Sequence, residues 1–262
     1  SVEPSAQHFH VFLGFNKTAE ELDFPQNNRW YLGFEDEDQK EGKYDYDAFI
    51  ERFHKDPLNA PMMGFLSFPS AKNPDFARER PGKATAILLT EIPRYHFEQW
   101  KDGKHDARGD DYVGLKEKIA NRLMEELLFK YYPKARGQVA KMDLGTALTA
   151  EYYLGSPFGE SYGLEHCCDR YFDFELNQLL KPKQCVKGLY LAGQDVITGG
   201  FASALSSGIY AAESVLGYHK FTCIASGRSL IKDLNKMDRY KDTKKDINDY
   251  DFDVVKAKIQ TE

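Results

Sequence analysis

The sequence predicts an α/β fold that includes an α+β region, and three patterns support this prediction. Aromatic and apolar runs bounded by turn-forming residues indicate strands within residues 8–92. A longer segment, 110–133, has apolar residues at the three- and four-residue spacing of a helix. A short apolar segment, a glycine-containing turn and a second helical pattern follow one another in residues 188–218.

The first part of the chain is expected to form a mixed sheet. Aromatic, apolar composition predicts four strands, at 8–15, 30–34, 62–68 and 84–92. The segments between them are expected to be an acidic loop, a short helix and a connection rich in Pro, Asn and Gly, at 35–43, 47–54 and 69–82.

The helix that follows is expected to bury one face. Six apolar residues line that face: Tyr112, Leu115, Ile119, Leu123, Leu127 and Tyr131. Asp110 or Asp111 is expected to cap its start, and Pro133 marks its end. Residues 143–163 contain four glycines and one proline among many hydroxyl side chains, so we expect an irregular, winding segment there.

Composition excludes several classes of protein. The chain has 262 residues, 42% of them hydrophobic, which is ample for a core. A net charge of -6 argues against nucleic-acid binding, and no apolar stretch is long enough for a transmembrane helix. The four cysteines suit neither zinc nor a disulfide framework, which favours a reducing intracellular compartment or organelle. No metal site is expected, because His8 and His10 share a strand face without a third ligand.

The strand–turn–helix pattern is the segment in which chemistry is expected. Gly188–Gly193 should be a short buried strand, and a turn through Asp195 leads into a helix that begins at Phe201. Such a unit directs free backbone N–H groups and a helix dipole at whatever lies before the turn, which favours an anion or a polarised carbonyl. The alternative is that the unit is packed for its own stability, because fold and function separate easily.

Three segments resemble one family of flavoenzymes. LAGQDVITGGFASALSSGIYAAESVLG, at 191–217, resembles the C-terminal flavin motif of FAD enzymes of the phytoene desaturase and amine oxidase type. FLSFPSAKNPDFARERPGKAT (65–85) and TALTAEYYLGSPFGESYGLEH (146–166) are similar to segments of retinol saturase and the related carotenoid isomerases. The three segments keep the order and approximate spacing of that family, so the resemblance spans about residues 8–220.

The resemblance implies a domain organisation. The chain would be the C-terminal part of a two-domain FAD-dependent fold of the amine oxidase and phytoene desaturase type, with the N-terminal Rossmann βαβ unit missing. Residues 1–145 would form the substrate-binding domain, and residues 146–220 the C-terminal part of the FAD-binding domain. Residues 221–262 would be a charged tail.

The resemblance also implies cofactor contacts. They are Gly193, Asp195, Gly199, Gly200, Phe201 and Ala202. Asp195 would accept hydrogen bonds from ribityl hydroxyls or position the turn whose amides do so, and the alternative is an ordinary turn or cap aspartate. The amides at 200–202 would face the flavin N1/O2 edge and stabilise the anionic reduced flavin.

A weaker set of residues is assigned to the substrate side. Tyr162 and Gly163, with Gly155 and Gly159, would line the passage between flavin and substrate, although a structural glycine loop explains them equally well. An apolar tunnel or a protein core would account for four aromatic residues, Phe65, Phe68, Tyr152 and Tyr153. No catalytic residue is identified, since the cofactor performs the difficult step in flavin hydride chemistry.

The motif that would hold the rest of the cofactor is missing. Residues 1–262 contain no G-x-G-x-x-G, so FAD is expected to bind only with a second chain or missing segment that carries it. The chain is thus a fragment or a naturally split subunit. The expected partners are that half, an apolar isoprenoid substrate, a membrane surface, and a larger assembly reached through the tail.

Two functions follow from these expectations. The first is half of an FAD-dependent oxidoreductase that saturates, desaturates or isomerises a double bond of a retinoid- or carotenoid-like isoprenoid. The second is a redox-inactive scaffold or assembly subunit derived from such an enzyme.

Overall fold

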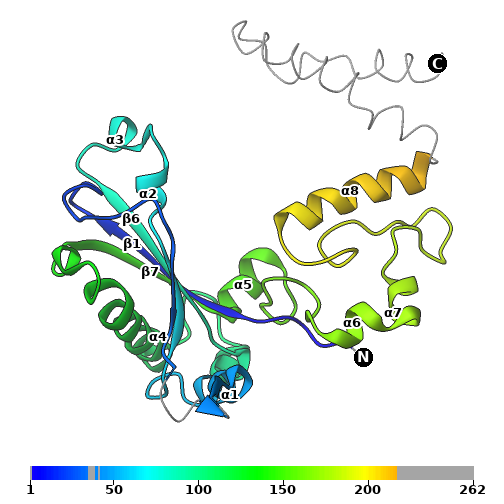
Figure 1. Cartoon of the computed structure of the whole chain (residues 1–262), viewed down its shortest axis with the longest axis horizontal. Helices are drawn as coiled ribbons and strands as arrows, with labels where there is room; N and C mark the ends of the chain where they lie inside the picture. The colour runs from blue at the N-terminus through cyan, green and yellow to red at the C-terminus, as the bar shows by residue number, and fades with distance from the viewer. Residues whose placement is uncertain (1, 35–38, 41, 217–262) are drawn as a thin grey trace, which may run out of the picture. The chain divides into compact units, whose positions relative to one another are not determined.

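The computed structural model describes residues 2–34, 39–40 and 42–216. The chain divides into two compact units, Ser1–Asp173 and Phe174–Glu262 (Figure 1). The expected charged tail, 221–262, and most of the expected acidic loop lie outside the described residues. The expected functional division at residue 145 stays a prediction.

The first unit is built on a five-stranded sheet in which every strand pair is antiparallel, so the prediction of a mixed sheet was wrong. Its strand order is β2-β5-β6-β1-β7. The bounds are His8–Phe15 for β1, Arg29–Leu32 for β2, Met63–Ser67 for β5, Ala84–Glu91 for β6 and Val139–Gly145 for β7. A separate hairpin joins β3 (Gln39–Lys40) to β4 (Lys43–Tyr44). The four predicted strands are confirmed, with ends that differ by one or two residues.

One face of this sheet forms the core. Alternate residues of β1 and β6 are buried on it: Phe9, Val11, Leu13, Phe15, Ala84, Ala86 and Leu88. The helix α4 (Asp110–Leu123) packs against β7, and the π-helical segment η3 (Met124–Phe129) packs against β5. Gly64 is needed at this contact, because a Cβ there would lie 2.4 Å from Leu127 Cδ2.

The remaining helices of the first unit are short. The longest is α1 (Tyr46–Lys55), whose N-cap Asp45 accepts a hydrogen bond of 3.1 Å from the Ala48 amide. The others are α2 (Pro69–Lys72), α3 (Phe76–Glu79), η2 (Arg94–Trp100), η4 (Pro133–Ala135), α5 (Ala147–Leu154) and α6 (Cys168–Phe172). Among the described residues, no helix is both long and apolar enough to cross a membrane.

Two local predictions for this unit were wrong. The residue that precedes α4 is Gly109, with φ of 92°, and Asp110 and Asp111 lie inside the first turn, where their charge favours the helix dipole. Residues 143–163 are not irregular throughout, because they contain the end of β7 and all of α5. The hydroxyl groups that suggested a loop begin this helix instead, since Thr146 N–H donates to Thr149 Oγ1 at 3.1 Å.

The second unit contains α7 (Phe174–Leu179) and α8 (Phe201–Leu216) among its described residues. The helix predicted after Gly200 is therefore confirmed, but the strand predicted at 188–193 lies outside any sheet. Its backbone bonds locally, with Leu191 N–H donating to Pro182 O at 2.7 Å and Leu189 N–H to Val186 O at 3.1 Å. The physical reason is that a strand needs a neighbouring strand, and the described part of this unit supplies only the isolated bridge Lys183–Tyr190.

Candidate functional site

The second face of the sheet carries an apolar row that crosses all five strands. Its residues are direct cross-strand partners: Trp30, Phe65, Leu89, His10 and Gly145. Ile87 and Phe12 pair in a parallel row beside it. We call these seven residues the open face.

The open face is partly exposed to solvent. Trp30 is 70% and Phe12 44% exposed, whereas Phe65, Ile87 and Leu89 are half-buried. The Trp30 and Phe65 rings lie 4.7 Å apart, and His10 stacks on Phe12 with ring centroids at 5.7 Å. A contiguous apolar surface of this kind is typical of a binding site.

Of this surface, the sequence predicted Phe65 as a tunnel or core residue and His10 as one of two histidines on a strand face. The signal was present, because the strands at 8–15, 62–68 and 84–92 are apolar on both alternating faces rather than on one. Such a pattern indicates a sheet covered on both sides. The tertiary structure shows which of the two faces the protein core covers.

Ionisable groups gather at one end of the open face. His8 pairs with Glu91 across β1 and β6, and the Glu91 carboxylate lies 3.3 Å from His54 Nε2 on α1. Burial lowers the pKa of His8, which the Glu91 carboxylate opposes. Burial and then the charge of His8 lower the pKa of His10. We call these four residues, His8, His10, Glu91 and His54, the polar end.

A loop at residues 161–163, within the glycine-containing segment 143–163, lies against the polar end. Ser161 Oγ is 2.6 Å from His8 Nδ1, and the Tyr162 ring meets the His8 ring edge-on at 5.8 Å. Ser5 holds this loop, since its Oγ accepts from Tyr162 N–H at 3.0 Å and its N–H donates to Gly163 O at 2.7 Å. The structure thus brings Tyr162 and Gly163 beside the histidines that the sequence alone left without a role.

Gly155 and Gly159 have structural functions in this segment. Gly155 ends α5 in the left-handed conformation, with φ of 68°. At Gly159 a Cβ would lie 2.2 Å from the carbonyl oxygen of Ala147, so only glycine fits. These observations favour the structural reading of both residues.

The remaining aromatic candidates do not form one tunnel. Phe68 is fully buried in the core, 4.4 Å from the Phe24 ring, whereas Tyr152 and Tyr153 are exposed. Tyr153 lines a cavity of about 530 Å³ beside β7, and its other lining residues include Arg108, Lys116 and Asp143. This cavity is mixed in charge, and it adjoins the open face because Phe12 and Gly145 also line it.

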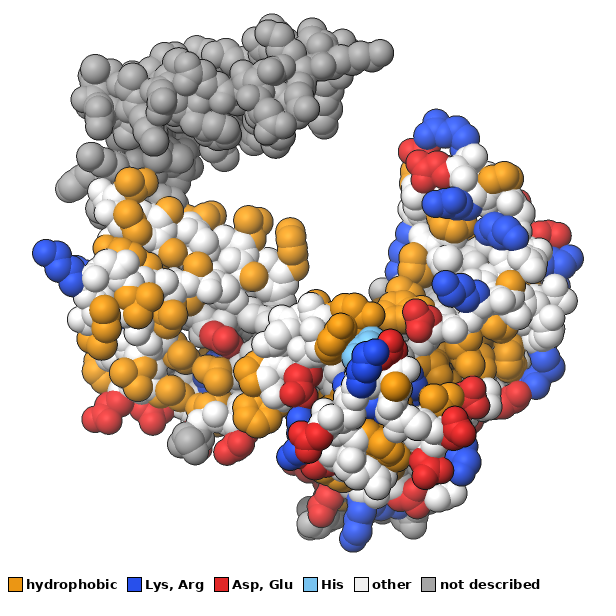
Figure 2. Space-filling view, turned by 180° about the vertical axis from the view of Figure 1, so that it is seen from behind, with side chains coloured by type: hydrophobic (Ala, Val, Ile, Leu, Met, Phe, Trp, Pro, Cys, Tyr) orange, Lys and Arg blue, Asp and Glu red, His pale blue; other side chains and the backbone are white. Residues whose placement is uncertain are grey.

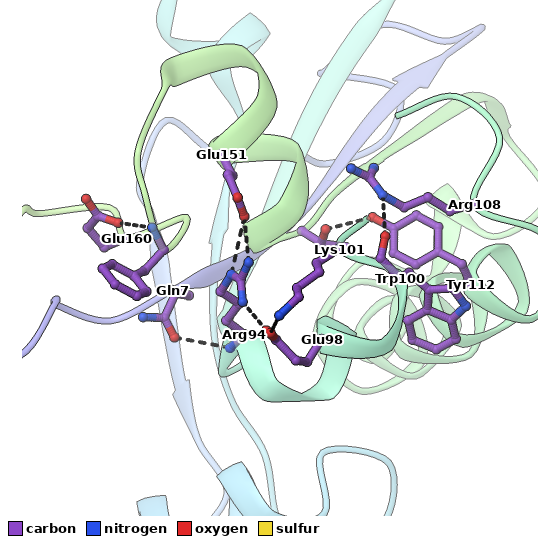
Figure 3. Close-up of polar contacts among 11 residues, drawn as sticks. Gln7, Arg94, Glu98, Trp100, Lys101, Arg108, Tyr112, Glu151 and Glu160 are labelled. Atoms are coloured by element: carbon purple, nitrogen blue, oxygen red, sulfur yellow. Dashed lines mark hydrogen bonds and ion pairs between the residues drawn. The ribbon is translucent and has the colours of Figure 1, made fainter. Parts of the chain in front are cut away.

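A cluster of ion pairs fixes the end of the sheet next to the polar end (Figure 3). Gln7 directly precedes His8, the first residue of β1, and its Oε1 atom accepts a hydrogen bond of 3.2 Å from Arg94 N–H. The Arg94 guanidinium contacts Glu98 on its own helical turn and Glu151 on α5, the latter at 3.0 Å. Arg94 therefore joins three elements, and its charge is engaged by two carboxylates.

The proposed cofactor turn occupies the second unit. Gly193 and Gly200 have φ of 116° and 97°, and no atom lies within 4 Å of where a Cβ would stand at either residue. Gly193 N–H donates to Ser207 Oγ at 2.6 Å, which ties the turn to α8. Gly200 N–H donates to Gln194 Oε1 at 3.2 Å, so this amide is engaged within the protein.

The start of α8 is open to solvent. Phe201 is 85% and Leu205 62% exposed, and Figure 2 shows hydrophobic side chains over the surface of this unit. The first helical amides, from Phe201 and Ala202 onward, have no acceptor within the helix. Gly199 and Gly200 end the turn, Phe201 and Ala202 begin α8, and together they form a surface that another molecule can approach closely. Among the described residues no group of histidine, cysteine or carboxylate side chains could hold a metal ion.

Comparison with known proteins identifies a set of relatives. The chain is 33% identical to an all-trans-retinol 13,14-reductase of Danio rerio over 206 residues, 79% of this chain and 33% of that protein. It is 30% identical to the human all-trans-retinol 13,14-reductase over 243 residues, 91% of this chain and 36% of that protein. An inactive all-trans-retinol 13,14-reductase of Danio rerio is 32% identical over 217 residues, 82% of this chain and 34% of that protein. The chain spans about a third of the length of these curated relatives. No protein-family model matches it.

Proposed function

Because the chain belongs to the retinol saturase-like family, we propose that it forms part of an FAD-dependent oxidoreductase acting on a double bond of a retinoid or related isoprenoid. In this proposal the open face binds the substrate, and the turn at 193–202 contacts the flavin. The nucleotide end of the cofactor is held by a G-x-G-x-x-G segment in another chain or another part of the same protein.

The apolar row of the open face is the observation that carries the proposal. Neighbouring strands lie about 4.8 Å apart, so five strands give the row a length of about 19 Å. An extended isoprenoid chain is apolar and narrow, and it can lie across such a row in contact with Trp30, Phe65 and Leu89. Burial of its hydrocarbon and of the exposed Trp30 ring would supply the binding free energy.

The residues of the cofactor turn fit one edge of a flavin. Positive φ at Gly193 and Gly200 and the open space beside both allow a planar ring to approach the backbone. The helix dipole of α8 and its first amides favour negative charge, which reduced flavin carries at its N1/O2 edge. When bound, the flavin supplies hydride transfer. Asp195 would position the turn or accept hydrogen bonds from ribityl hydroxyls.

In this scheme the chain's own residues bind and orient the substrate. The open face holds the hydrocarbon and excludes water from one side of it. The loop at 161–163 borders the substrate beside His8. We assign no catalytic residue.

Retinol binding to the chain tests the substrate assignment. The two tryptophans lie on different elements: Trp30 is on β2 in the open face, whereas Trp100 is on η2 and packs 5.4 Å from the Tyr112 ring. In single-tryptophan variants we expect all-trans-retinol to quench Trp30 emission in Trp100→Phe strongly and Trp100 emission in Trp30→Phe weakly. Equal quenching in the two variants would place the ligand elsewhere.

Affinity gives a second measurement, made with the fluorescence of retinol itself. Trp30→Ser should weaken binding by about 2 kcal/mol, roughly thirtyfold, because a large aromatic surface is lost from the wall. Val186→Ser is the matched control, since Val186 is 58% exposed and belongs to the second unit, outside the open face. If both variants bind retinol like the unchanged protein, the open face is not the substrate wall.

A redox-inactive assembly role is the second candidate. It is favoured by the likeness to the inactive reductase of Danio rerio and by the exposed apolar residues of α8, Phe201, Leu205 and Ile209, which a partner could cover. This role requires no flavin. Flavin absorbance of the protein purified with its natural partners separates the two candidates.

A further inference from the structure

The open face is apolar along most of its length and ionisable at one end. The protein would therefore contact its substrate at two places, along the hydrocarbon and at one terminus. Resting on the proposed function, we propose that His8 and His10, with Glu91 beside them, bind the hydroxyl end of an isoprenoid alcohol and select it over the corresponding carboxylic acid.

The hydrogen-bonding capacity of the polar end matches a hydroxyl group. A neutral imidazole has one donor and one acceptor, and a hydroxyl group has both as well. Ser161 engages Nδ1 of His8, which leaves Nε2 as the atom for a second partner. His10 lies in the apolar row itself, two residues along the same strand face, with its ring 6.3 Å from that of His8.

The charges around the polar end disfavour a carboxylate. Glu91 faces His8 from β6 and places a like charge beside any bound acid. Burial lowers the pKa of both His8 and His10, so the imidazoles are neutral at pH 7.5 and offer no full positive charge. The fixed cation at this end of the sheet, Arg94, is engaged by Glu98 and Glu151.

Neighbouring elements contribute cations farther along the sheet: Lys55 on α1 lines a pocket with His54, and Arg108 and Lys116 line the cavity beside Gly145. Glu91 is the charged residue paired with His8 itself. His54 and Tyr46 face Glu91 from α1, and burial raises the pKa of Tyr46, so its phenol is neutral. The loop contributes Ser161, Tyr162 and then His166, whose ring lies 6.1 Å from that of Tyr162. From β7, the partner of His10 is the buried Gly145, where a Cβ would lie 3.6 Å from His10 Cβ.

Binding of three probes that share one polyene chain tests this inference. All-trans-retinol, all-trans-retinoic acid and the analogue that ends in a methyl group are titrated into the 262-residue chain at pH 7.5. We expect retinol to bind about tenfold more tightly than the acid. Glu91→Gln should reduce this ratio to about threefold or less, with little change for retinol. Glu79→Gln is the control, because it removes an exposed carboxylate from α3, outside the polar end.

The double variant His8→Leu/His10→Leu examines the hydroxyl contact. It should weaken retinol binding about tenfold while the methyl-ended analogue binds as well as before, which also shows that the sheet has folded. Equal affinity for alcohol and acid in the unchanged protein, or tighter binding of the acid, would overturn this inference while leaving the open face as substrate wall. Failure of all three probes to bind would instead refute the proposed function.

Discussion

Substitution of Gly159 by alanine tests the structural role assigned to the loop beside the polar end. Gly159 has φ of 68°, and a Cβ added there would lie 2.2 Å from Ala147 O and 2.6 Å from Ala147 C and Cα. These are backbone atoms at the start of α5, so no side-chain rotation can relieve the overlap. Gly155 has the same φ of 68°, but a Cβ there meets no atom within 4 Å.

The substitutions Gly155→Ala and Gly159→Ala together separate the cost of a positive φ from the cost of steric overlap with the Ala147 backbone. Alanine at either position costs about 1 kcal/mol, because an L residue resists positive φ. At Gly159 the forced displacement of backbone adds about 2 kcal/mol, in the range of overpacked sites. Gly155→Ala should therefore lower the melting temperature by about 3 °C, and Gly159→Ala by about 9 °C.

Thermal unfolding followed by circular dichroism measures both variants. A second readout is the imidazole NMR signal of His8, since Ser161 follows Gly159 by two residues and holds the His8 ring. Gly159→Ala should shift this signal, and Gly155→Ala should leave it in place. Equal losses of stability in the two variants would show that the overlap is relieved at no cost, and the structural assignment of Gly159 would fail.

Three further predictions concern the core, pH and the cofactor turn. Leu127→Ala should cost about 3 kcal/mol in urea unfolding, because this fully buried side chain packs on Gly64; a loss below about 1 kcal/mol would contradict that packing. Since burial depresses the pKa of His8 and His10 below the usual value of about 6.5, the unfolded chain binds more protons, and the free energy of unfolding should fall as pH drops below about 6.5. The double variant His8→Gln/His10→Gln should flatten that fall, and an unchanged slope would assign it to other groups. In the flavin-loaded protein, Asp195→Ala should weaken flavin binding about ten- to a hundredfold, measured by fluorescence titration, and unchanged affinity would remove Asp195 from the cofactor site.

Local patterns in the sequence determined much of the first unit. The strands 8–15 and 84–92 and the helix that starts near residue 110 were predictable because apolar periodicity reflects which side chains are buried. The family was also accessible from sequence, since the motif at 191–217 and the two segments before it are short and contiguous. Comparison with the curated relatives confirms the retinol saturase-like family.

Elements that depend on distant partners were not predictable. The apolar segment 188–193 reads as a strand, yet a strand forms only where another strand accepts its hydrogen bonds, and composition does not contain that information. The strand β7 was missed for the opposite reason, because its partner β1 stabilises a sequence with charged residues at Lys141 and Asp143.

The candidate substrate site was decided by tertiary structure. Sequence placed His8 and His10 on one strand face but could not show that Glu91, His54 and Ser161 meet them there. These contacts join residues as far as 153 positions apart, and only the pairing of strands and the return of the loop bring them together. Strand alternation determines which side chains share a face, whereas the packing of α4 and η3 determines which face is the core and which is left open.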